Sequence, residues 1–341
     1  MELTPHFGSS FRPSCPRCQQ SFRGRPILLS LPVREILSVC LCRYLQNDNI
    51  SLLLRDRSGF VCLWARFGFV NATRGVVDII AASFPDLRDI RLTLDRLRKE
   101  AGRNGAWRLQ TALAEGNEMQ SFFLQSGFSV EGRKKDAYRI GTEPRAAMLL
   151  GSLLEAPRHG PMPEPSDPGP RQTAKAVEIV AAHPDYAAAY LEFDRAVRAE
   201  TPNLLRTSSE IPSSFSEYKE RLCAFNGSDS GSWLAIVSPG TVAGAITGVT
   251  PFGPFAEGDV ALWIAVRKAY WRQGIGRCLM DALVNWGRIR GVRRLTAEVL
   301  STNDGARAFY LRNGFEVEAV RPLAVFLHGI HLEGLVMGRQ I

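Results

Sequence analysis

Two glycines flanked by arginines form a stretch that could bind a phosphate group. Residues 269–277 read AYWRQGIGR, with Gly274 and Gly276 as the glycine pair and Arg272 and Arg277 as mobile positive charges. The first N–H groups of a helix lack internal partners and carry the positive end of its dipole, so they can bind a pyrophosphate. Glycines let the anion approach those amides closely. A purely structural turn would use the same residues, so the pair alone does not decide between the two.

The residues on either side of the glycines predict the elements that would position them. Residues 260–266 are apolar and rich in Val, Ile and Trp, which indicates a buried strand. After the glycines the period becomes helical, and Gly287 or Gly291 could end that helix. Its apolar face, on which Cys278 is expected to be a core residue, comprises Ile275, Cys278, Leu279, Ala282, Leu283 and Trp286. Strand, glycine turn and helix follow in the order that a phosphate site requires.

A second segment supports the first. Residues 303–315 read NDGARAFYLRNGF and follow another strand-like run at residues 294–300. Asn303, Ala306 and Tyr310 are spaced three and then four residues apart, so they line one face of a helix that Gly314 would end in the left-handed region. A polar end, a small gap and a phenol on one stripe could form a wall of a cofactor site.

Together these elements resemble the GNAT family of N-acetyltransferases. The resemblance rests on strand, Gln-Gly-Ile-Gly turn, helix, strand, and an Asn-x-x-Ala-x-x-x-Tyr helix closed by Gly-Phe, and it covers roughly residues 172–341. It implies an α/β (α+β) fold with a mixed, mostly antiparallel central sheet flanked by helices. It also implies acetyl-CoA as co-substrate, held in a cleft between two splayed strands, and no metal.

The resemblance assigns cofactor contacts to particular residues. The pantetheine arm would pair with the strand before the glycine turn, and Asn303 would bind the cofactor arm beside Ala306. The pyrophosphate would lie on the loop amides. The residues implied are Ile264, Ala265, Val266, Trp271, Arg272, Gln273, Gly274, Ile275, Gly276, Arg277, Asn303 and Ala306. Trp271 stands where the family usually has Arg or Gln, a substitution that some relatives share.

The implied chemistry is direct attack of a primary amine on the thioester in a ternary complex. The step forms an oxyanion, expels a thiolate and sheds a proton, so it uses amide donors, an acid and a base. Tyr310, a phenol with an ordinary pKa of about 10, is the candidate general acid. The thioester is already activated, so no covalent enzyme intermediate is required. A non-catalytic acyl-CoA-binding or regulatory protein that keeps the fold is the alternative.

The sequence offers no clear general base. Glu257, Asp259 and Glu298 are weak candidates, and each could equally be an ordinary solvated charge. Proton loss through water, or binding of an already neutral amine, would leave no trace in the sequence. Small polyamines, amino acids, antibiotics and protein N-termini all remain open as acceptors. The possible acceptor-pocket residues, which could equally be packing residues, are Glu210, Tyr218, Phe252 and Phe255.

The chain is long enough for two domains. Of its 341 residues, positions 155–171 form a Pro-rich linker, which separates a domain at 1–154 from the catalytic domain at 172–341. Residues 117–128 mirror residues 303–315, so the fold is expected in two tandem copies. Residues 1–45 are poorly interpretable.

The N-terminal copy is expected to be degenerate. Phe123 stands at the position of Tyr310 and has no hydroxyl group. After the strand-like run at 76–82, residues 83–90 contain no glycine, and Asp86 and Asp89 would repel a pyrophosphate. Cofactor binding and catalysis are therefore expected only in the C-terminal domain.

The net charge and the cysteines indicate which partners and which cellular compartment to expect. A formal net charge of +8 favours anionic partners such as acetyl-CoA, but the arginines form no nucleic-acid motif, so nucleic acid is not expected as a partner. A single Cys15-x-x-Cys18 lacks a second ligand pair, and the seven cysteines indicate reduced cytosolic thiols. The apolar run at 27–41 is too short to span a membrane. We expect a cytoplasmic protein, either a monomer with two pseudo-repeat domains or a homodimer.

Overall fold

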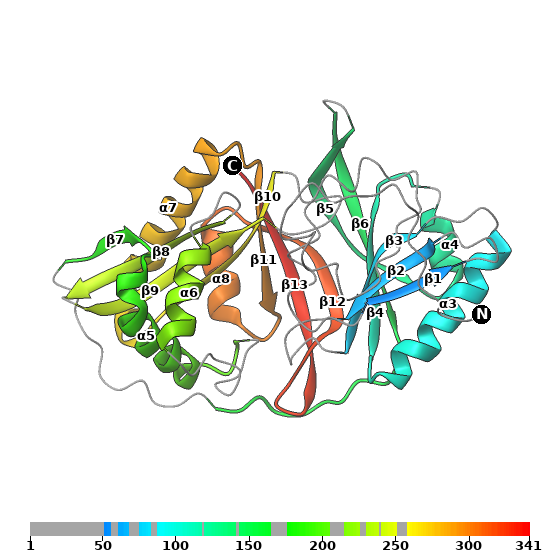
Figure 1. Cartoon of the computed structure of the whole chain (residues 1–341), viewed down its shortest axis with the longest axis horizontal. Helices are drawn as coiled ribbons and strands as arrows, with labels where there is room; N and C mark the ends of the chain where they lie inside the picture. Colours follow the sequence, from blue (N-terminus) through cyan, green and yellow to red (C-terminus); the bar gives the residue numbers. More distant parts are fainter. Residues whose placement is uncertain are drawn as a thin grey trace. The chain divides into compact units, whose positions relative to one another are not determined.

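The chain folds into two compact units (Figure 1). In this computed structural model the described residues are 51–55, 61–67, 75–82, 87–117, 119–140, 143–164, 176–204, 215–225, 230–238, 240–250 and 258–341. The N-terminal unit contains Met1–Gly132, Met148–Pro157 and Phe252–Pro254, and the C-terminal unit contains Arg133–Ala147, Arg158–Pro251 and Phe255–Ile341. Among the described residues, no helix is long and apolar enough to cross a membrane.

The C-terminal unit is built around a mixed sheet, coloured from green to red in Figure 1. Its strands run in the order β12-β13-β11-β10-β9-β8-β7. The β10–β11 pair is parallel, and the other neighbours pair antiparallel. A mixed, mostly antiparallel sheet was predicted, and this is confirmed. The strands are β7 (Glu178–Ala181), β8 (Ser230–Ser238), β9 (Thr241–Val249), β10 (Asp259–Val266), β11 (Arg294–Leu300), β12 (Glu316–Leu327) and β13 (Ile330–Gln340).

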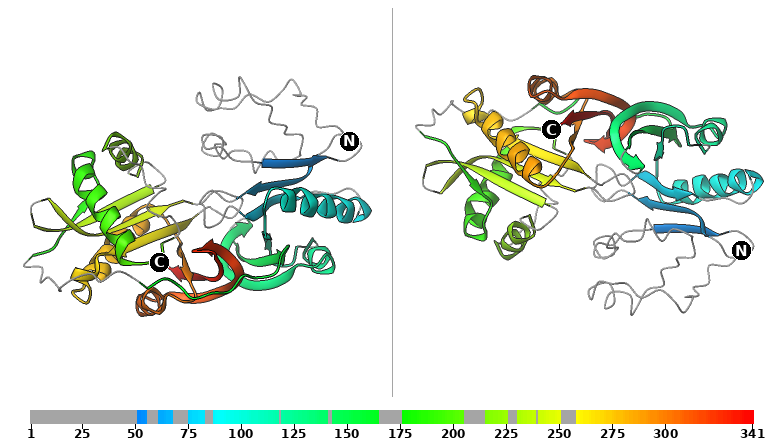
Figure 2. Two further views of the ribbon diagram at one scale, coloured as in Figure 1. Left: turned by 90° about the horizontal axis from the view of Figure 1, so that it is seen from below. Right: turned by 90° about the horizontal axis from the view of Figure 1, so that it is seen from above.

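Helices cover both faces of this sheet. Figure 2 shows α5 and α6 on one face and α7 on the other. Each face has its own core, and β9 contributes to both, which explains why β9 is buried from Val242 to Gly248 without alternation. The helical elements are η2 (Pro184–Tyr186), α5 (Ala187–Glu200), α6 (Phe215–Phe225), η4 (Lys268–Tyr270), α7 (Ile275–Ile289) and α8 (Asp304–Arg312).

The N-terminal unit has a related element order. Its strands run β1-β2-β3-β4-β6-β5, with β3 and β4 parallel; of β5 and β6, the parts up to Gly132 and from Met148 belong to this unit. Leu94 and Leu97 of α3 and Phe123 of α4 are fully buried in one core cluster. The elements are β1 (Ser51–Arg55), β2 (Val61–Phe67), β3 (Val76–Ala82), α3 (Leu87–Arg103), β4 (Arg108–Ala114), α4 (Met119–Gln125), β5 (Ser129–Ile140) and β6 (Glu143–Leu153).

Most predicted elements of the C-terminal unit are present. The strand predicted at 294–300 coincides with β11, and the helix after the glycine pair ends before Gly291, whose φ is 71°. The prediction that Cys278 is a core residue is wrong: Cys278 is exposed, because it lies at the edge of the apolar stripe. Several predictions fall outside the described residues, namely those on Cys15, Cys18, residues 27–41, residues 83–86, residues 165–171, Glu210, Phe252, Phe255 and Glu257.

Candidate functional site

The two parallel strands of the C-terminal unit part soon after they begin. Their pairing runs from Asp259 opposite Arg294 to Ala261 opposite Thr296. Beyond that point β10 continues along β9 to Val266, whereas β11 continues along β13. The edge of β10 that faces β11 therefore presents backbone groups outside the parallel ladder, and such an edge can bind an extended ligand. The implied pantetheine residues Ile264, Ala265 and Val266 are half-buried on this part of β10.

A hydrogen-bonded loop leads from β10 towards α7. Arg267 N donates to Ala243 O at 2.9 Å, and Tyr270 N donates to Arg267 O at 2.9 Å. The indole Nε1 of Trp271 donates back to Val266 O at 2.6 Å. Arg272 then adopts a φ of 64°, a left-handed conformation that is uncommon for a residue with a side chain. The loop is therefore an ordered connection with a sharp change of direction at its end.

The start of α7 is open to an anion. Gly274 is the N-cap of α7 and has no side chain with which to cap it, so the amides of Ile275 and Gly276 are left without an N-cap acceptor, whereas Arg277 N donates to Gly274 O at 2.9 Å. The start of α8 differs, because Asn303 Oδ1 accepts from Ala306 N at 3.1 Å. Arg272 and Arg277 are exposed beside the α7 terminus and add positive charge.

Glycine is required at positions 274 and 276 for different structural reasons. Gly274 has a φ of 79°, and a Cβ there would meet no atom within 4 Å, so its backbone conformation is what demands glycine. A Cβ on Gly276 would lie 3.0 Å from Cε2 of Phe309. Gly276 therefore allows α7 to approach α8 closely, in addition to the expected access for an anion.

Tyr310 lies in the core beneath these elements. Tyr310 is 6 % exposed, and its ring packs edge-on to Phe309 and Phe315, with centroid distances of 5.4 and 5.1 Å. Ile264 and Val266 pack against the same core cluster. Burial raises the pKa of the Tyr310 phenol, so the hydroxyl keeps its proton at neutral pH and can act as a donor.

The two described carboxylates that were considered as bases both have partners. Asp259 is 1 % exposed and accepts from Thr296 Oγ1 at 2.7 Å, with Arg294 Nε at 3.5 Å from its carboxylate. Glu298 is exposed and pairs with Arg321 Nη1 at 2.7 Å. Asp259 lies on the paired start of β10 and Glu298 lies on β11. Neither residue belongs to the splayed end of β10.

Helices α5 and α6 contain a residue pair that the sequence did not reveal. Tyr218, considered as a pocket residue, is fully buried and donates its hydroxyl to Asp194 Oδ2 at 2.6 Å, so it joins α6 to α5. At the end of α5, Glu200 Oε2 accepts from Lys268 N at 2.7 Å. An acid at a helix end resembles an ordinary surface charge in the sequence, and no local pattern indicates this contact.

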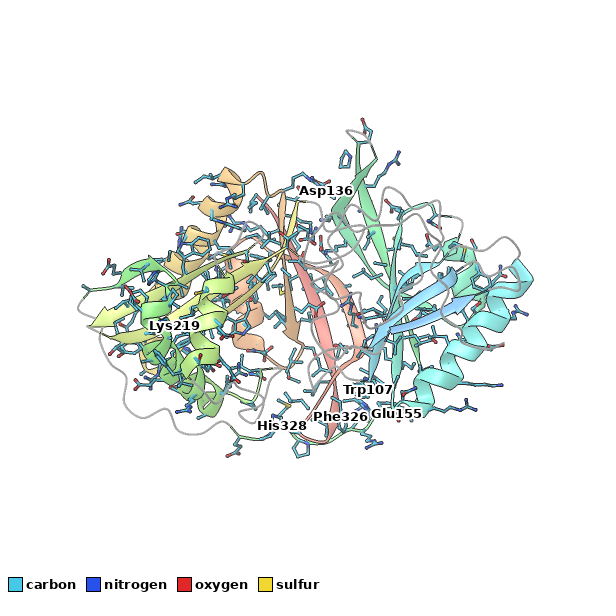
Figure 3. The ribbon with its side chains drawn as sticks, viewed as in Figure 1. Trp107, Asp136, Glu155, Lys219, Phe326 and His328 are labelled. Carbon is cyan, nitrogen blue, oxygen red and sulfur yellow. The ribbon has the colours of Figure 1, made fainter. Side chains whose placement is uncertain are left out.

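The end of α5 also meets the hairpin between β12 and β13. Figure 3 shows Phe326 and His328 at the end of this hairpin. His328 Nε2 lies 3.3 Å from Pro202 O, in the stretch that follows α5. The end of α5 is therefore bonded to the loop before α7, and the chain just after it contacts the hairpin.

Comparison with known families bears on this region of the chain. Residues 198–315 match the family model described as Acetyltransferase (GNAT) family. The match begins in the last turn of α5 and ends at Phe315, so it contains the splayed strands, the glycine loop and α8. This segment is a GNAT acetyltransferase domain. Acyl transfer is the general activity that this family implies.

Solved structures similar to this chain cover about half of it. An acetyltransferase of the GNAT family from Streptococcus pneumoniae is 24 % identical, with 49 % of this chain and 100 % of that chain covered and a TM-score of 0.46. A ribosomal-protein-alanine N-acetyltransferase from Brucella melitensis is 23 % identical, with 48 % and 99 % covered and a TM-score of 0.43. The putative acetyltransferase yncA from Salmonella typhimurium, solved with acetyl-CoA, is 19 % identical, with 49 % and 94 % covered and a TM-score of 0.44. No curated protein matches the chain.

Proposed function

We propose that this protein is an N-acetyltransferase that moves the acetyl group of acetyl-CoA to a primary amine in its C-terminal unit. The observation that carries the proposal is the parting of β10 and β11 ahead of an α7 terminus whose N-cap, Gly274, has no capping side chain. Both features lie within the segment that matches the GNAT model. A splayed strand edge suits the amides of a pantetheine arm, and an open helix terminus suits a pyrophosphate.

The cofactor would run along the splayed end of β10. Ile264 and Ala265 would pair with its amides. Val266 O already accepts from Trp271, but a carbonyl oxygen has two lone pairs and can accept a second bond. The α7 amides would hold the pyrophosphate, with Arg272 and Arg277 adding charge. The remaining residues proposed for this site are Gln273, Gly274, Ile275, Gly276, Asn303 and Ala306.

Tyr310 is proposed as the general acid. The amine nitrogen forms a bond to the acetyl carbon, the carbon–sulfur bond breaks, and the departing thiolate takes the phenol proton. The tetrahedral adduct loses its ammonium proton to solvent as it collapses to the amide, and solvent returns a proton to Tyr310. Burial raises the phenol pKa, so the hydroxyl stays protonated until the carbon–sulfur bond breaks and then donates to the leaving sulfur.

The N-terminal unit is proposed as a degenerate second copy of the same fold. Phe128 N donates to Phe123 O at 3.0 Å, and Phe315 N donates to Tyr310 O at 3.1 Å. The rings within these two pairs meet edge-on at centroid distances of 4.9 and 5.1 Å. Equivalent turns with Phe in place of Tyr support a copy that keeps the packing and lacks the acid.

Titration calorimetry with acetyl-CoA, followed by a thiol-release assay over a panel of amines, tests the proposal. We expect one acetyl-CoA bound per chain and turnover on at least one amine. Failure of acetyl-CoA to bind would overturn the proposal. Binding without turnover on any amine would favour a non-catalytic acyl-CoA-binding protein, a second candidate that rests on the engaged carboxylates of Asp259 and Glu298.

A further inference from the structure

Glu200 is a buried carboxylate at the end of helix α5. It is the last residue of this helix, and its side chain is 9 % exposed. The position is unfavourable for a negative charge twice over. The free carbonyls at a helix C-terminus carry partial negative charge, and burial removes water from the carboxylate. A carboxylate at such a place needs compensating partners.

Those partners come from the loop before α7. Glu200 Oε2 accepts from Lys268 N at 2.7 Å, and Glu200 Oε1 lies 3.3 Å from Arg267 Nε. Lys268 is the first residue of η4, and the N-cap residue Arg267 offers this short helix no side-chain cap of its own. Glu200 Oε2 therefore caps η4 from another helix, while Oε1 forms an ion pair with the side chain of Arg267, the N-cap residue of η4.

The helix that carries Glu200 is firmly packed. Phe193 and Val197 of α5 are 1 % and 3 % exposed in the core beneath β8 and β9. On the other side of the contact, η4 leads through Trp271 and the left-handed residues Arg272 and Gly274 into α7. A short loop that starts from a fixed point can deliver the amides of α7 in a fixed position.

We propose that Glu200 is a positioning residue for acetyl-CoA: its carboxylate fixes the start of the loop that presents the α7 amides to the cofactor pyrophosphate. The inference rests on the proposed function of this loop. It assigns to α5, a helix far from the loop in sequence, a direct effect on cofactor affinity. Preorganised donors bind without the cost of ordering them at each binding event.

The test compares Glu200→Ala and Glu200→Gln with wild type, using Glu192→Ala, an exposed glutamate of the same helix, as the matched control. We expect Glu200→Ala to raise the Kd and KM for acetyl-CoA about tenfold, with kcat at saturating cofactor within about twofold of wild type. Glu200→Gln keeps an oxygen that can accept from Lys268 N, so its Kd should rise only about threefold. Glu192→Ala should leave both values unchanged.

A second measurement does not depend on acetyl-CoA. Hydrogen exchange of the ligand-free variants, read on a peptide covering residues 263–274, should show the Lys268 amide exchanging about tenfold faster in Glu200→Ala than in wild type. A variant that melts at a lower temperature but keeps wild-type affinity and exchange would overturn the inference and leave Glu200 a merely structural residue. If wild type does not bind acetyl-CoA, the proposed function fails, and faster exchange would show that Glu200 still holds the loop.

Discussion

In both units a glycine carbonyl joins the two parallel strands where they begin. Gly258 O accepts from Arg294 N at 3.1 Å in the C-terminal unit, and Gly75 O accepts from Arg108 N at 3.1 Å in the N-terminal unit. Both arginines are the first residues of their strands, β11 and β4, and both are almost fully buried. The two units therefore share the construction that holds their central strands together at this end.

The buried arginines also have equivalent partners. Arg294 pairs with Glu318 of β12, and Arg108 pairs with Glu131 of β5. In each unit a glycine lies against the ion pair, Gly338 in one and Gly151 in the other, and a methyl group at either would collide with the paired side chains. Such an arrangement is costly to build and leaves little room for substitution.

The strands differ where a ligand would enter. In the N-terminal unit the parallel pairing reaches Ile79 opposite Thr111, and Thr111 Oγ1 donates to Ile79 O at 2.9 Å. Ile79 and Thr111 each lie three residues after the first parallel pair of their strands. The residues at the same distance in the C-terminal unit are Leu262 and Ala297, which lie beyond the last parallel pair. A methyl group cannot donate to a strand carbonyl. The C-terminal strands therefore separate earlier than the N-terminal ones. Residue 297 has no hydroxyl group that could join the separated strands. The two units can thus share their packing at the start of the strands while only one of them has room for a ligand between the strands.

The largest expected effect comes from making the two units alike at the proposed acid. Tyr310→Phe gives the C-terminal unit the residue that Phe123 supplies in the N-terminal unit. Loss of a general acid should lower kcat at least about 100-fold, while the Kd for acetyl-CoA stays within about twofold. Thiol-release kinetics and calorimetry measure the two values. An unchanged kcat would remove Tyr310 from the mechanism.

The next largest expected effect tests whether the buried ion pair of the N-terminal unit contributes to stability and not to acetyl-CoA binding. Arg108→Met leaves the Glu131 carboxylate buried without its partner, which should cost about 3 to 5 kcal/mol of unfolding free energy. The double variant Arg108→Met/Glu131→Leu removes both charges and should recover most of that loss. Urea denaturation measures the free energies. The Kd for acetyl-CoA should stay at its wild-type value, and a weakened affinity in the folded single variant would contradict a binding site confined to the C-terminal unit.

A smaller effect is expected at Gly276, which we propose serves both helix packing and cofactor binding. Gly276→Leu places side-chain atoms against Phe309 and over the α7 amides, so we expect a loss of about 1 to 3 kcal/mol of stability together with weaker acetyl-CoA binding. Phe309→Ala makes room beneath residue 276 and should relieve the stability loss in the double variant, measured by urea denaturation. Full affinity in folded Gly276→Leu would show that the cofactor does not approach this helix terminus.

The features that sequence predicted are those whose physics is local. Apolar runs located β10 and β11, the change of period located α7, and Gly314 marked the end of α8 with a φ of 79°. The packing of Gly276 against Phe309 was not predictable, because it joins two helices through space. The hydrogen bond from Lys268 N to Glu200 Oε2 was not predictable either, because the two residues are separated by 68 positions. A long-range contact leaves no periodicity in a single sequence.

The smallest effect compares two helix caps. Asn303 Oδ1 accepts from Ala306 N at 3.1 Å, and Asn117 Oδ1 accepts from Met119 N at 2.8 Å. Asn303→Ala and Asn117→Ala should each cost about 1 kcal/mol of unfolding free energy, because each leaves a helix start without its acceptor. Only Asn303→Ala should also weaken acetyl-CoA binding, by about threefold to tenfold, since the amide Nδ2 of Asn303 would donate to the cofactor arm. Calorimetry on both variants decides the matter: equal affinities would make Asn303 a cap and nothing more, as Asn117 is.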